Sequence, residues 1–416
     1  MKEITGTTDL KSNILWNTSG TVFYQGCLWL MTVLVARMSS DYQNAGMLAF
    51  AMSVGNIYTA IGTFTMRTFQ VSDIAEKYSS SNYIAFRIFT VGLGFILCAI
   101  YGIIVSPSIE TTLVILSFLL FKADESFVNV FYGCDQKAKR LDIVGKSQFI
   151  RGLLIIVLFV LGMKATDNLS LSLCCIFFAC IATTIIFDRA QTKGTTSSIV
   201  PSIKKSQCFT LFKICLPTVV GNVIAGLIVS AARQYFGIAF GEEALGIYAT
   251  VATPCVIIQV LAQNLYAPLL LPIAETLHDE GAKEAWKKAA KMILMVMTVS
   301  VVLSILLITV STPLLHFLYG NTILPYVNVL PMALLVMSEI AVSYAITDVL
   351  IIYGKLKQTL MLSFIAFICM GICIIPLTNA WYMNGLNATL IIAYAIAIIY
   401  GLITIYFSVK KDDDHR

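Results

Sequence analysis

A series of long apolar runs, separated by short polar segments, limits what this chain can fold into. A helix needs about 20 mainly apolar residues to cross the hydrocarbon core of a bilayer. Runs of about that length cover residues 14–36, 44–65, 83–105, 111–133, 147–164, 169–187, 209–238, 245–270, 291–311, 325–352, 357–377 and 387–408. Only 12% of the residues are charged, against about 25% in a typical soluble domain. The sequence therefore predicts an all-α integral membrane protein with about 12 transmembrane helices.

The lysines and arginines fall almost entirely on one side of these predicted spans. Of the 28 basic residues, Arg37 and Lys164 fall in outer loops and Lys122 and Arg233 lie within spans, while the remaining 24 share the side of both chain ends. Cytoplasmic loops of membrane proteins are enriched in lysine and arginine. We therefore expect both termini in the cytoplasm. The basic residues are scattered through short loops, so the net positive charge does not indicate nucleic-acid binding.

The chain divides into two halves of six predicted spans each. Residues 191–208 are polar, basic and rich in Ser and Thr, which is typical of a linker. We expect an N-terminal six-helix bundle over 1–190, a cytoplasmic linker over 191–208 and a C-terminal bundle over 209–416. Short similarities between the halves, such as Tyr132-Gly133 and Tyr353-Gly354, favour parallel repeats. Such repeats enclose a substrate site where they meet in the membrane.

The fourth span carries charge in its middle. Lys122, Asp124 and Glu125 interrupt the run 113–131, and a charge at that depth costs roughly 2.5–3.5 kcal/mol on insertion scales. On a helical wheel Lys122 and Glu125 share one side with Asn129, whereas Asp124 points elsewhere. The i,i+3 spacing lets Lys122 and Glu125 partly neutralise each other. These groups either hold helices together or belong to a functional site.

Other polar residues interrupt the remaining spans. Arg233 lies in the outer third of the seventh span, where it either snorkels to the interface or serves a site. Glu339 lies near the middle of the tenth span. Asp348 lies nearer the inner end of that span and on its opposite face, and a single acid near a span end commonly forms a helix–helix hydrogen bond. Near the inner ends of their spans are three arginines that either anchor to phospholipids or meet an anionic head group: Arg67, Arg87 and Arg151.

The sequence shows no pattern of a metal or cofactor site. The three histidines, His278, His316 and His415, are far apart. Most of the 11 cysteines lie inside apolar runs and form no metal-type spacing with histidine. We expect no metal, no cofactor and no catalytic residue.

Two stretches carry a resemblance to a known family. The first is Lys122-Ala-Asp-Glu-Ser126 followed by Tyr132-Gly133, Gln136, Arg140, Asp142 and Arg151-Gly152. The second is Arg233-Gln-Tyr-Phe236 followed by Gly241-Glu-Glu-Ala-Leu-Gly-Ile-Tyr-Ala249. Together they resemble the polysaccharide biosynthesis flippases of Wzx type, which move O-antigen and capsule repeat units. That family belongs to the multidrug/oligosaccharidyl-lipid/polysaccharide exporter superfamily, and the twelve-span plan extends the likeness to the whole chain.

The resemblance implies a fold, a substrate and a location. It implies a V-shaped pair of six-helix bundles in the bacterial cytoplasmic (inner) membrane, working by alternating access. The substrate would be an undecaprenyl-diphosphate-linked oligosaccharide, moved to the outer leaflet for O-antigen, capsule or exopolysaccharide assembly. The implied partners are membrane lipids, a polysaccharide polymerase with its chain-length machinery, and a proton or sodium as coupling ion, with no nucleic acid.

The residues suited to such a substrate fall into two groups. A diphosphate head group needs fixed cations and a glycan needs hydrogen-bonding and aromatic partners. The candidates for these roles are Lys122, Arg233, Arg37, Arg67, Asn129, Asn222 and Tyr24, with Asn17, Gln25 and Tyr132 beside them. The candidates for charge balance or ion coupling are Asp124, Glu125, Glu339 and Asp348. Of the acids, Glu339 is expected to take up a proton and Glu125 to balance Lys122.

Two other functions fit parts of the sequence. A drug or cation antiporter of the same fold would need a cavity dominated by carboxylates, and Lys122 and Arg233 argue against cationic cargo. A membrane-embedded polysaccharide polymerase or ligase usually needs a large outer loop with catalytic residues, and the predicted outer loops are short. We therefore expect a transporter and not an enzyme.

Overall fold

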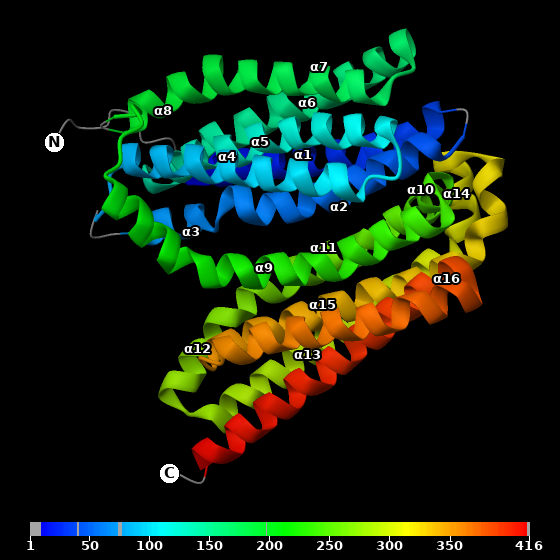
Figure 1. The fold of residues 1–416 in the computed structure, drawn as a ribbon. Coiled ribbons are helices and arrows are strands. Elements are labelled where there is room, and N and C mark those ends of the chain that lie inside the picture. The colour runs from blue at the N-terminus through cyan, green and yellow to red at the C-terminus, as the bar shows by residue number, and fades with distance from the viewer. Residues whose placement is uncertain (1–9, 40, 74–76, 197, 414–416) are drawn as a thin grey trace. The chain divides into compact units, whose positions relative to one another are not determined.

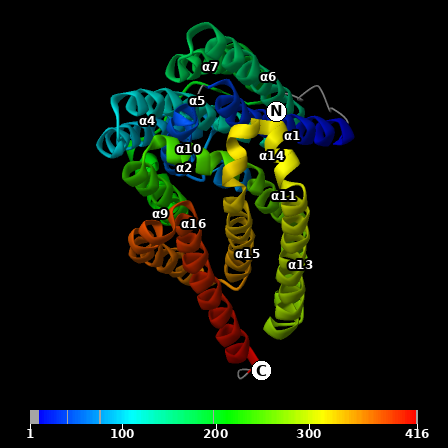
Figure 2. The same ribbon diagram turned by 90° about the vertical axis from the view of Figure 1, so that its right-hand side faces the viewer.

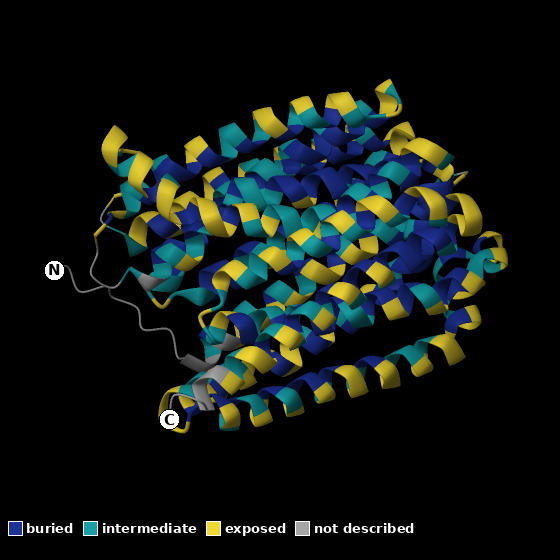
Figure 3. Cartoon of the chain, turned by 60° about the horizontal axis from the view of Figure 1, so that its bottom comes forward, coloured by how far each residue is buried: buried dark blue, intermediate teal, exposed yellow. Residues whose placement is uncertain are grey.

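The protein is described by a computed structural model that covers residues 10–39, 41–73, 77–196 and 198–413. Within these residues the chain is helical and contains no strand (Figure 1). Exposed and buried residues alternate around the long helices (Figure 3), as expected where one side of a helix packs on protein and the other faces lipid.

Contacts along the chain divide it into two compact units, Met1–Val223 and Ile224–Arg416. The helices of the first unit are α1 (Leu10–Met38), α2 (Gln43–Thr63), α3 (Met66–Ser72), α4 (Ser80–Val105), α5 (Ile109–Lys137), α6 (Leu141–Thr166), α7 (Leu169–Thr183), the π-helix η1 (Thr184–Asp188) and α8 (Arg189–Thr195). Helix α9 (Lys205–Phe240) begins in this unit and ends in the next.

The second unit continues from α9 through a more broken series of helices. They are α10 (Glu242–Ala252), η2 (Thr253–Cys255), α11 (Val256–Tyr266), η3 (Ala267–Leu269), α12 (Leu270–Asp279), α13 (Ala282–Thr309), α14 (Ser311–Tyr319), η4 (Asn321–Val329), α15 (Leu330–Ile352) and α16 (Leu356–Asp413). Helices α13 and α15 pack on each other (Figure 2). Pro254 and Pro268 each lie in a short 3-10 segment, which accounts for the breaks on either side of α11.

The prediction of about 12 spans is confirmed. Ten helices of the described chain are long and apolar enough to cross a membrane. Helix α5 is equally long but carries Lys122, Asp124 and Glu125 within it. Helix α16 contains two of the predicted spans, which meet where Tyr382 leaves the helical conformation. The molecule is a multi-pass, all-α membrane protein.

The boundary between the two units falls inside α9. Leu211, Cys215 and Val219 at the start of α9 belong to a hydrophobic core of the first unit. The segment predicted as a linker starts within α8 and is attached to the first unit, because Asn82 Nδ2 donates to the carbonyl oxygen of Ser202 at 2.7 Å. The predicted bundle limits 1–190 and 209–416 stay predictions.

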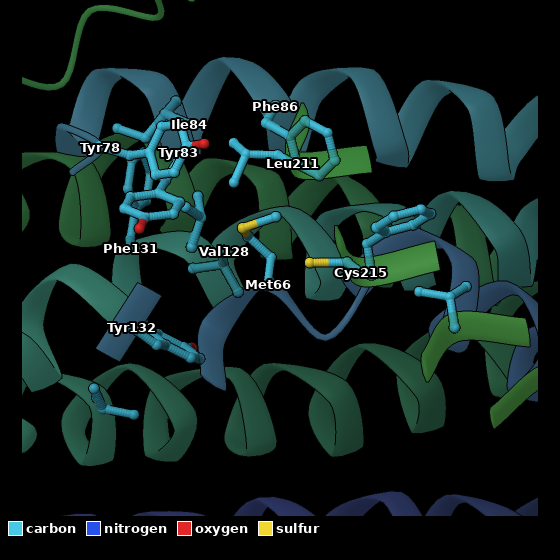
Figure 4. Packing of buried hydrophobic residues seen from close by; sticks show 14 residues of the cluster. Met66, Tyr78, Tyr83, Ile84, Phe86, Val128, Phe131, Tyr132, Leu211 and Cys215 are labelled. Carbon is cyan, nitrogen blue, oxygen red and sulfur yellow. The ribbon is translucent and has the colours of Figure 1, made fainter. Parts of the chain in front are cut away.

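This hydrophobic core lies around the N-terminal end of α4. Figure 4 shows Tyr78, Tyr83 and Phe131 gathered together, with Leu211 next to Phe86. The adjoining turn is held by Asp73, which accepts hydrogen bonds from Tyr83 Oη at 2.7 Å and from the backbone N–H of Tyr78 at 3.0 Å. Partial burial raises the pKa of the Asp73 carboxyl, but these hydrogen bonds outweigh it, so the net pKa is below its ordinary value.

Helices α1 and α6 pack closely against each other at a pair of glycines. An ideal Cβ on Gly20 would lie 2.1 Å from the carbonyl oxygen of Gly145, and one on Gly145 would lie 2.0 Å from the carbonyl oxygen of Trp16. These neighbours are backbone atoms, so they cannot move aside without separating the helices. Small residues allow membrane helices to pack at such short range.

We expect Gly145→Ala to lower stability by about 1–3 kcal/mol, because the added methyl group overpacks the α1–α6 contact. The measurement is the thermal unfolding midpoint of the detergent-purified protein. Gly26→Ala on α1 is the matched control, since a Cβ there meets nothing within 4 Å. Equal midpoints for the two variants would show that the contact tolerates a side chain.

Candidate functional site

The intramembrane lysine of α5 is paired within its own helix. Lys122 Nζ donates to Glu125 Oε2 at 2.6 Å, and the two side chains are 15% and 29% exposed. The ammonium also lies 5.6 Å from the ring centres of Phe118 and Phe121. The predicted i,i+3 pairing is therefore confirmed, and the charge of Lys122 is largely balanced by its neighbour.

Asp124, the third charged residue in the middle of α5, faces the opposite way, into a buried ion network. Asp124 accepts a hydrogen bond from Arg151 Nη1 on α6 and another, at 2.6 Å, from Thr184 Oγ1 on η1. A second nitrogen of the same guanidinium, Nη2, donates to Asp188 Oδ2 at 3.0 Å. The side chains of Asp124 and Asp188 are each 1% exposed and that of Arg151 is 3% exposed. We call Asp124, Arg151 and Asp188 the buried triad.

A π-helical turn brings two of these partners together. Thr184 and Asp188 are the first and last residues of η1, and both contact the guanidinium of Arg151. A π-turn inserts an extra residue into a helix and re-aims the side chains around it. The network extends further, because Arg151 Nε donates to Ser147 Oγ at 3.3 Å and that hydroxyl shares a 2.7 Å hydrogen bond with Tyr132.

Two of the three arginines expected near the inner ends of their spans are deeply buried. Arg87 is fully buried and donates to the carbonyl oxygen of Gly62 at 2.9 Å and to Asn129 Oδ1 at 3.4 Å. Arg151 belongs to the buried triad. The interpretation as phospholipid anchors is therefore wrong for both, because neither guanidinium reaches the surface. Arg67 is half-buried and donates to Gln136 Oε1 at 3.0 Å.

The other polar candidates of the first unit are dispersed. Tyr24 is buried, with 4% of its surface exposed, and Asn17 is half-buried. Exposed positions are taken by Gln25, Arg37 and Asn222. The structure thus brings together Lys122 with Glu125, Asn129 with Arg87, and Arg67 with Tyr132, whose ring lies 5.8 Å from the guanidinium carbon.

In the second unit Arg233 of α9 is half-buried and packs against Tyr248 of α10, 5.9 Å from the ring centre. Tyr248 is fixed in turn, since its hydroxyl donates to Asn387 Oδ1 at 2.9 Å. Within the described chain, Arg233 has no carboxylate partner and its buried Nε has no hydrogen-bond acceptor. Its guanidinium is therefore positioned by an aromatic ring while its charge is left uncompensated.

The two acids of α15 differ in their surroundings. Asp348 Oδ2 accepts from the hydroxyl of Tyr266 on α11 at 2.9 Å, which is the predicted helix–helix hydrogen bond. Glu339 is half-buried, and its buried Oε2 has no partner among the residues that the structure describes. Across those residues no group of three or more His, Cys, Asp and Glu side chains is arranged to hold a metal ion.

Neither the role of Asp188 nor the burial of Arg151 is evident from the sequence. Asp188 directly follows the last residue of the predicted span 169–187, where the apolar run ends. One signal was available: an acid and a base, Asp188 and Arg151, lie at the inner ends of two consecutive spans. Since charge is costly at that depth, opposite charges on neighbouring spans favour a pair.

A curated relative matches almost the entire chain. The capsular polysaccharide biosynthesis protein CapF of Staphylococcus aureus is 24% identical over 380 residues, which is 90% of this chain and 93% of the relative. No protein-family model matches the sequence.

Solved structures share the fold. An inward-facing multidrug resistance MATE family transporter of the MOP superfamily superposes with a TM-score of 0.73 at 12% identity, covering 97% of this chain and 99% of that one. The lipid II flippase MurJ, in an inward closed conformation, superposes with a TM-score of 0.74 at 14% identity, covering 94% and 87%. The chain therefore has the same fold as these two solved transporters.

Proposed function

We propose that this protein is a flippase for lipid-linked oligosaccharide repeat units. It would carry a glycan on undecaprenyl diphosphate from the cytoplasmic to the outer leaflet of the bacterial inner membrane by alternating access. The product would feed a polysaccharide polymerase and its chain-length machinery. The observation that carries the proposal is the match to a capsular polysaccharide biosynthesis protein over 90% of the chain, on a fold shared with a lipid II flippase.

The distribution of charge supports an anionic cargo. In the part of the chain that the structure describes, Arg67 and Arg233 are half-buried and neither forms an ion pair. The intramembrane acids Asp124 and Glu125 are both matched by basic groups. A diphosphate needs fixed cations that are not already neutralised, and guanidinium groups bind phosphate oxygens two at a time. We propose Arg233 and Arg67 as the primary head-group cations, with Lys122 available when Glu125 releases it.

The charge pattern disfavours the two alternatives. A drug or cation antiporter would use free carboxylates. Among the described acids of the membrane helices, Glu339 and Asp188 each have a buried oxygen without a partner, but Asp188 is already paired with Arg151. A single acid is compatible with coupling to a proton but not with a cavity built for cations. A polymerase or ligase would need paired reactive groups on the outer side, and the short helix α14 (Ser311–Tyr319) and the 3-10 helix η4 (Asn321–Val329) supply one histidine and no acid there.

The Arg233→Gln variant tests the head-group assignment. We expect at least tenfold slower translocation with unchanged protein level, because a charge-assisted hydrogen bond to phosphate is worth about 1.5–3 kcal/mol. Lys164→Gln is the control, since Lys164 is an exposed basic residue on the predicted outer side. The measurement is outer-leaflet exposure of lipid-linked oligosaccharide in proteoliposomes. Equal rates for Arg233→Gln and the unsubstituted protein would remove Arg233 from the site.

The same proteoliposomes test the class of transporter. We expect movement of lipid-linked oligosaccharide and no efflux of cationic dyes. Imposing a pH or sodium gradient then shows which ion drives turnover, and a rate that ignores the pH gradient would exclude Glu339 as a proton site. Dye efflux without oligosaccharide movement would establish the antiporter instead.

A further inference from the structure

An apolar groove in the first unit lies between α4 and α7, which both pack on α5. It has a volume of about 490 Å³, within the range of ligand-sized pockets. Its walls are formed by side chains such as Phe95, Ile96, Phe127, Phe177 and Ile185. Ile96 and Ile185 are 58% and 54% exposed, so the groove opens outward between them. In a membrane-spanning unit such apolar openings face hydrocarbon.

The groove reaches the buried triad at its inner side. Asp124 and Thr184 line it, but their oxygens are turned toward Arg151 and toward each other. A filled groove therefore keeps a desolvated ion pair dry, and an empty one would admit water to it. Gly92 contributes a further hollow, since a Cβ there would meet nothing within 4 Å.

Basic residues follow the groove-lining residues along the same series of helices. Helices α7, η1 and α8 follow one another without a break. They carry a row of residues at i,i+4 spacing: Phe177, Ile181 and Ile185, then Arg189 and Lys193. Arg189 and Lys193 are both exposed. From Phe177 to Ile185 is eight residues, or about 12 Å of helix, which is close to the roughly 15 Å of hydrocarbon in one leaflet. The length of the row thus matches one lipid molecule. Its acyl chain would lie along Ile181 and Ile185, and its phosphate would lie at Arg189 and Lys193.

We propose that the groove and the cations Arg189 and Lys193 bind one anionic phospholipid. The leaflet is the one at the Arg189 end of α7, which is the inner leaflet in the proposed orientation. Charge complementarity selects an anionic head group, because basic residues at a membrane surface attract such lipids. The lipid is separate from the transported one: the groove-lining residues Leu120, Ala123 and Phe127 lie on the side of α5 opposite Lys122 and Glu125.

Native mass spectrometry of the full-length protein tests this site without any transport reaction. The protein is delipidated in detergent and titrated with phosphatidylglycerol, phosphatidylcholine or undecaprenyl phosphate. We expect Gly92→Phe, which fills the groove, to weaken phosphatidylglycerol binding at least tenfold. Gly371→Phe is the control, because Gly371 of α16 is another helical glycine whose Cβ would meet nothing within 4 Å.

Charge substitutions test the head-group end. The double variant Arg189→Gln and Lys193→Gln is expected to lose the preference for phosphatidylglycerol over phosphatidylcholine while still binding both. Lys204→Gln with Lys205→Gln, which removes two other exposed lysines, should keep that preference. Unchanged binding in Gly92→Phe would overturn the proposal. So would stronger retention of undecaprenyl phosphate than of phosphatidylglycerol, which would make the groove a substrate-tail site.

Discussion

Replacing Arg151 with methionine is expected to remove most of the folded protein from the membrane. The substitution leaves Asp124 and Asp188 facing each other without their shared cation, with each side chain 1% exposed. Breaking a buried ion pair by removing one partner costs about 3–5 kcal/mol, a large part of the stability of a typical domain. The measurement is the yield of monodisperse protein after detergent extraction, together with its thermal unfolding midpoint.

Two further variants identify the cause of the loss. Lys146→Met removes a basic group from the same helix, but Lys146 is 41% exposed in its pair with Asp142, and exposed pairs contribute about 0–1 kcal/mol. It should therefore change little. Combining Arg151→Met with Asp124→Asn and Asp188→Asn removes every charge of the buried triad and should restore much of the yield. If Arg151→Met is as stable as the unsubstituted protein, the triad contributes nothing to folding.

The span pattern could be predicted from the sequence because hydrophobic length is a local property of each segment. Most runs are apolar enough to be recognised by themselves, and the three central charges of α5 do not prevent its helix from forming. The Lys122–Glu125 pair was predictable for the same reason, since both partners lie on one helix at i,i+3 spacing.

The buried triad could not be predicted in the same way. Its members lie on α5, α6 and η1, and which faces of those helices meet depends on tertiary packing. The π-turn at Thr184–Asp188 adds to the difficulty, because it displaces Asp188 from the position that a regular α-helix would give it. Arg87 shows the same limit: its partners, Gly62 and Asn129, come from two other helices.

Lys122→Ala is expected to abolish translocation while the protein still inserts in the membrane. In the proposed mechanism the Lys122 ammonium leaves Glu125 and binds the diphosphate. Without Lys122, the negative charge of Glu125 would repel the anionic head group. Lys122→Arg should keep part of the rate, because the charge remains but a planar fork replaces a compact ammonium. The measurement is again outer-leaflet exposure of lipid-linked oligosaccharide in proteoliposomes, normalised to protein content.

A neutral double variant separates substrate binding from helix packing. Lys122→Met with Glu125→Gln removes both charges and keeps side chains of similar length, so no half-buried group is left uncompensated. If the pair only stabilises α5, this variant should transport normally. If Lys122 meets the head group, the protein level should recover but translocation should stay at least tenfold slower, since no cation replaces Lys122.

The Glu125→Gln single variant completes the cycle. It frees Lys122 permanently, so this variant should bind the head group more tightly and release the head group more slowly. Full transport by the double variant would return both residues to a structural role.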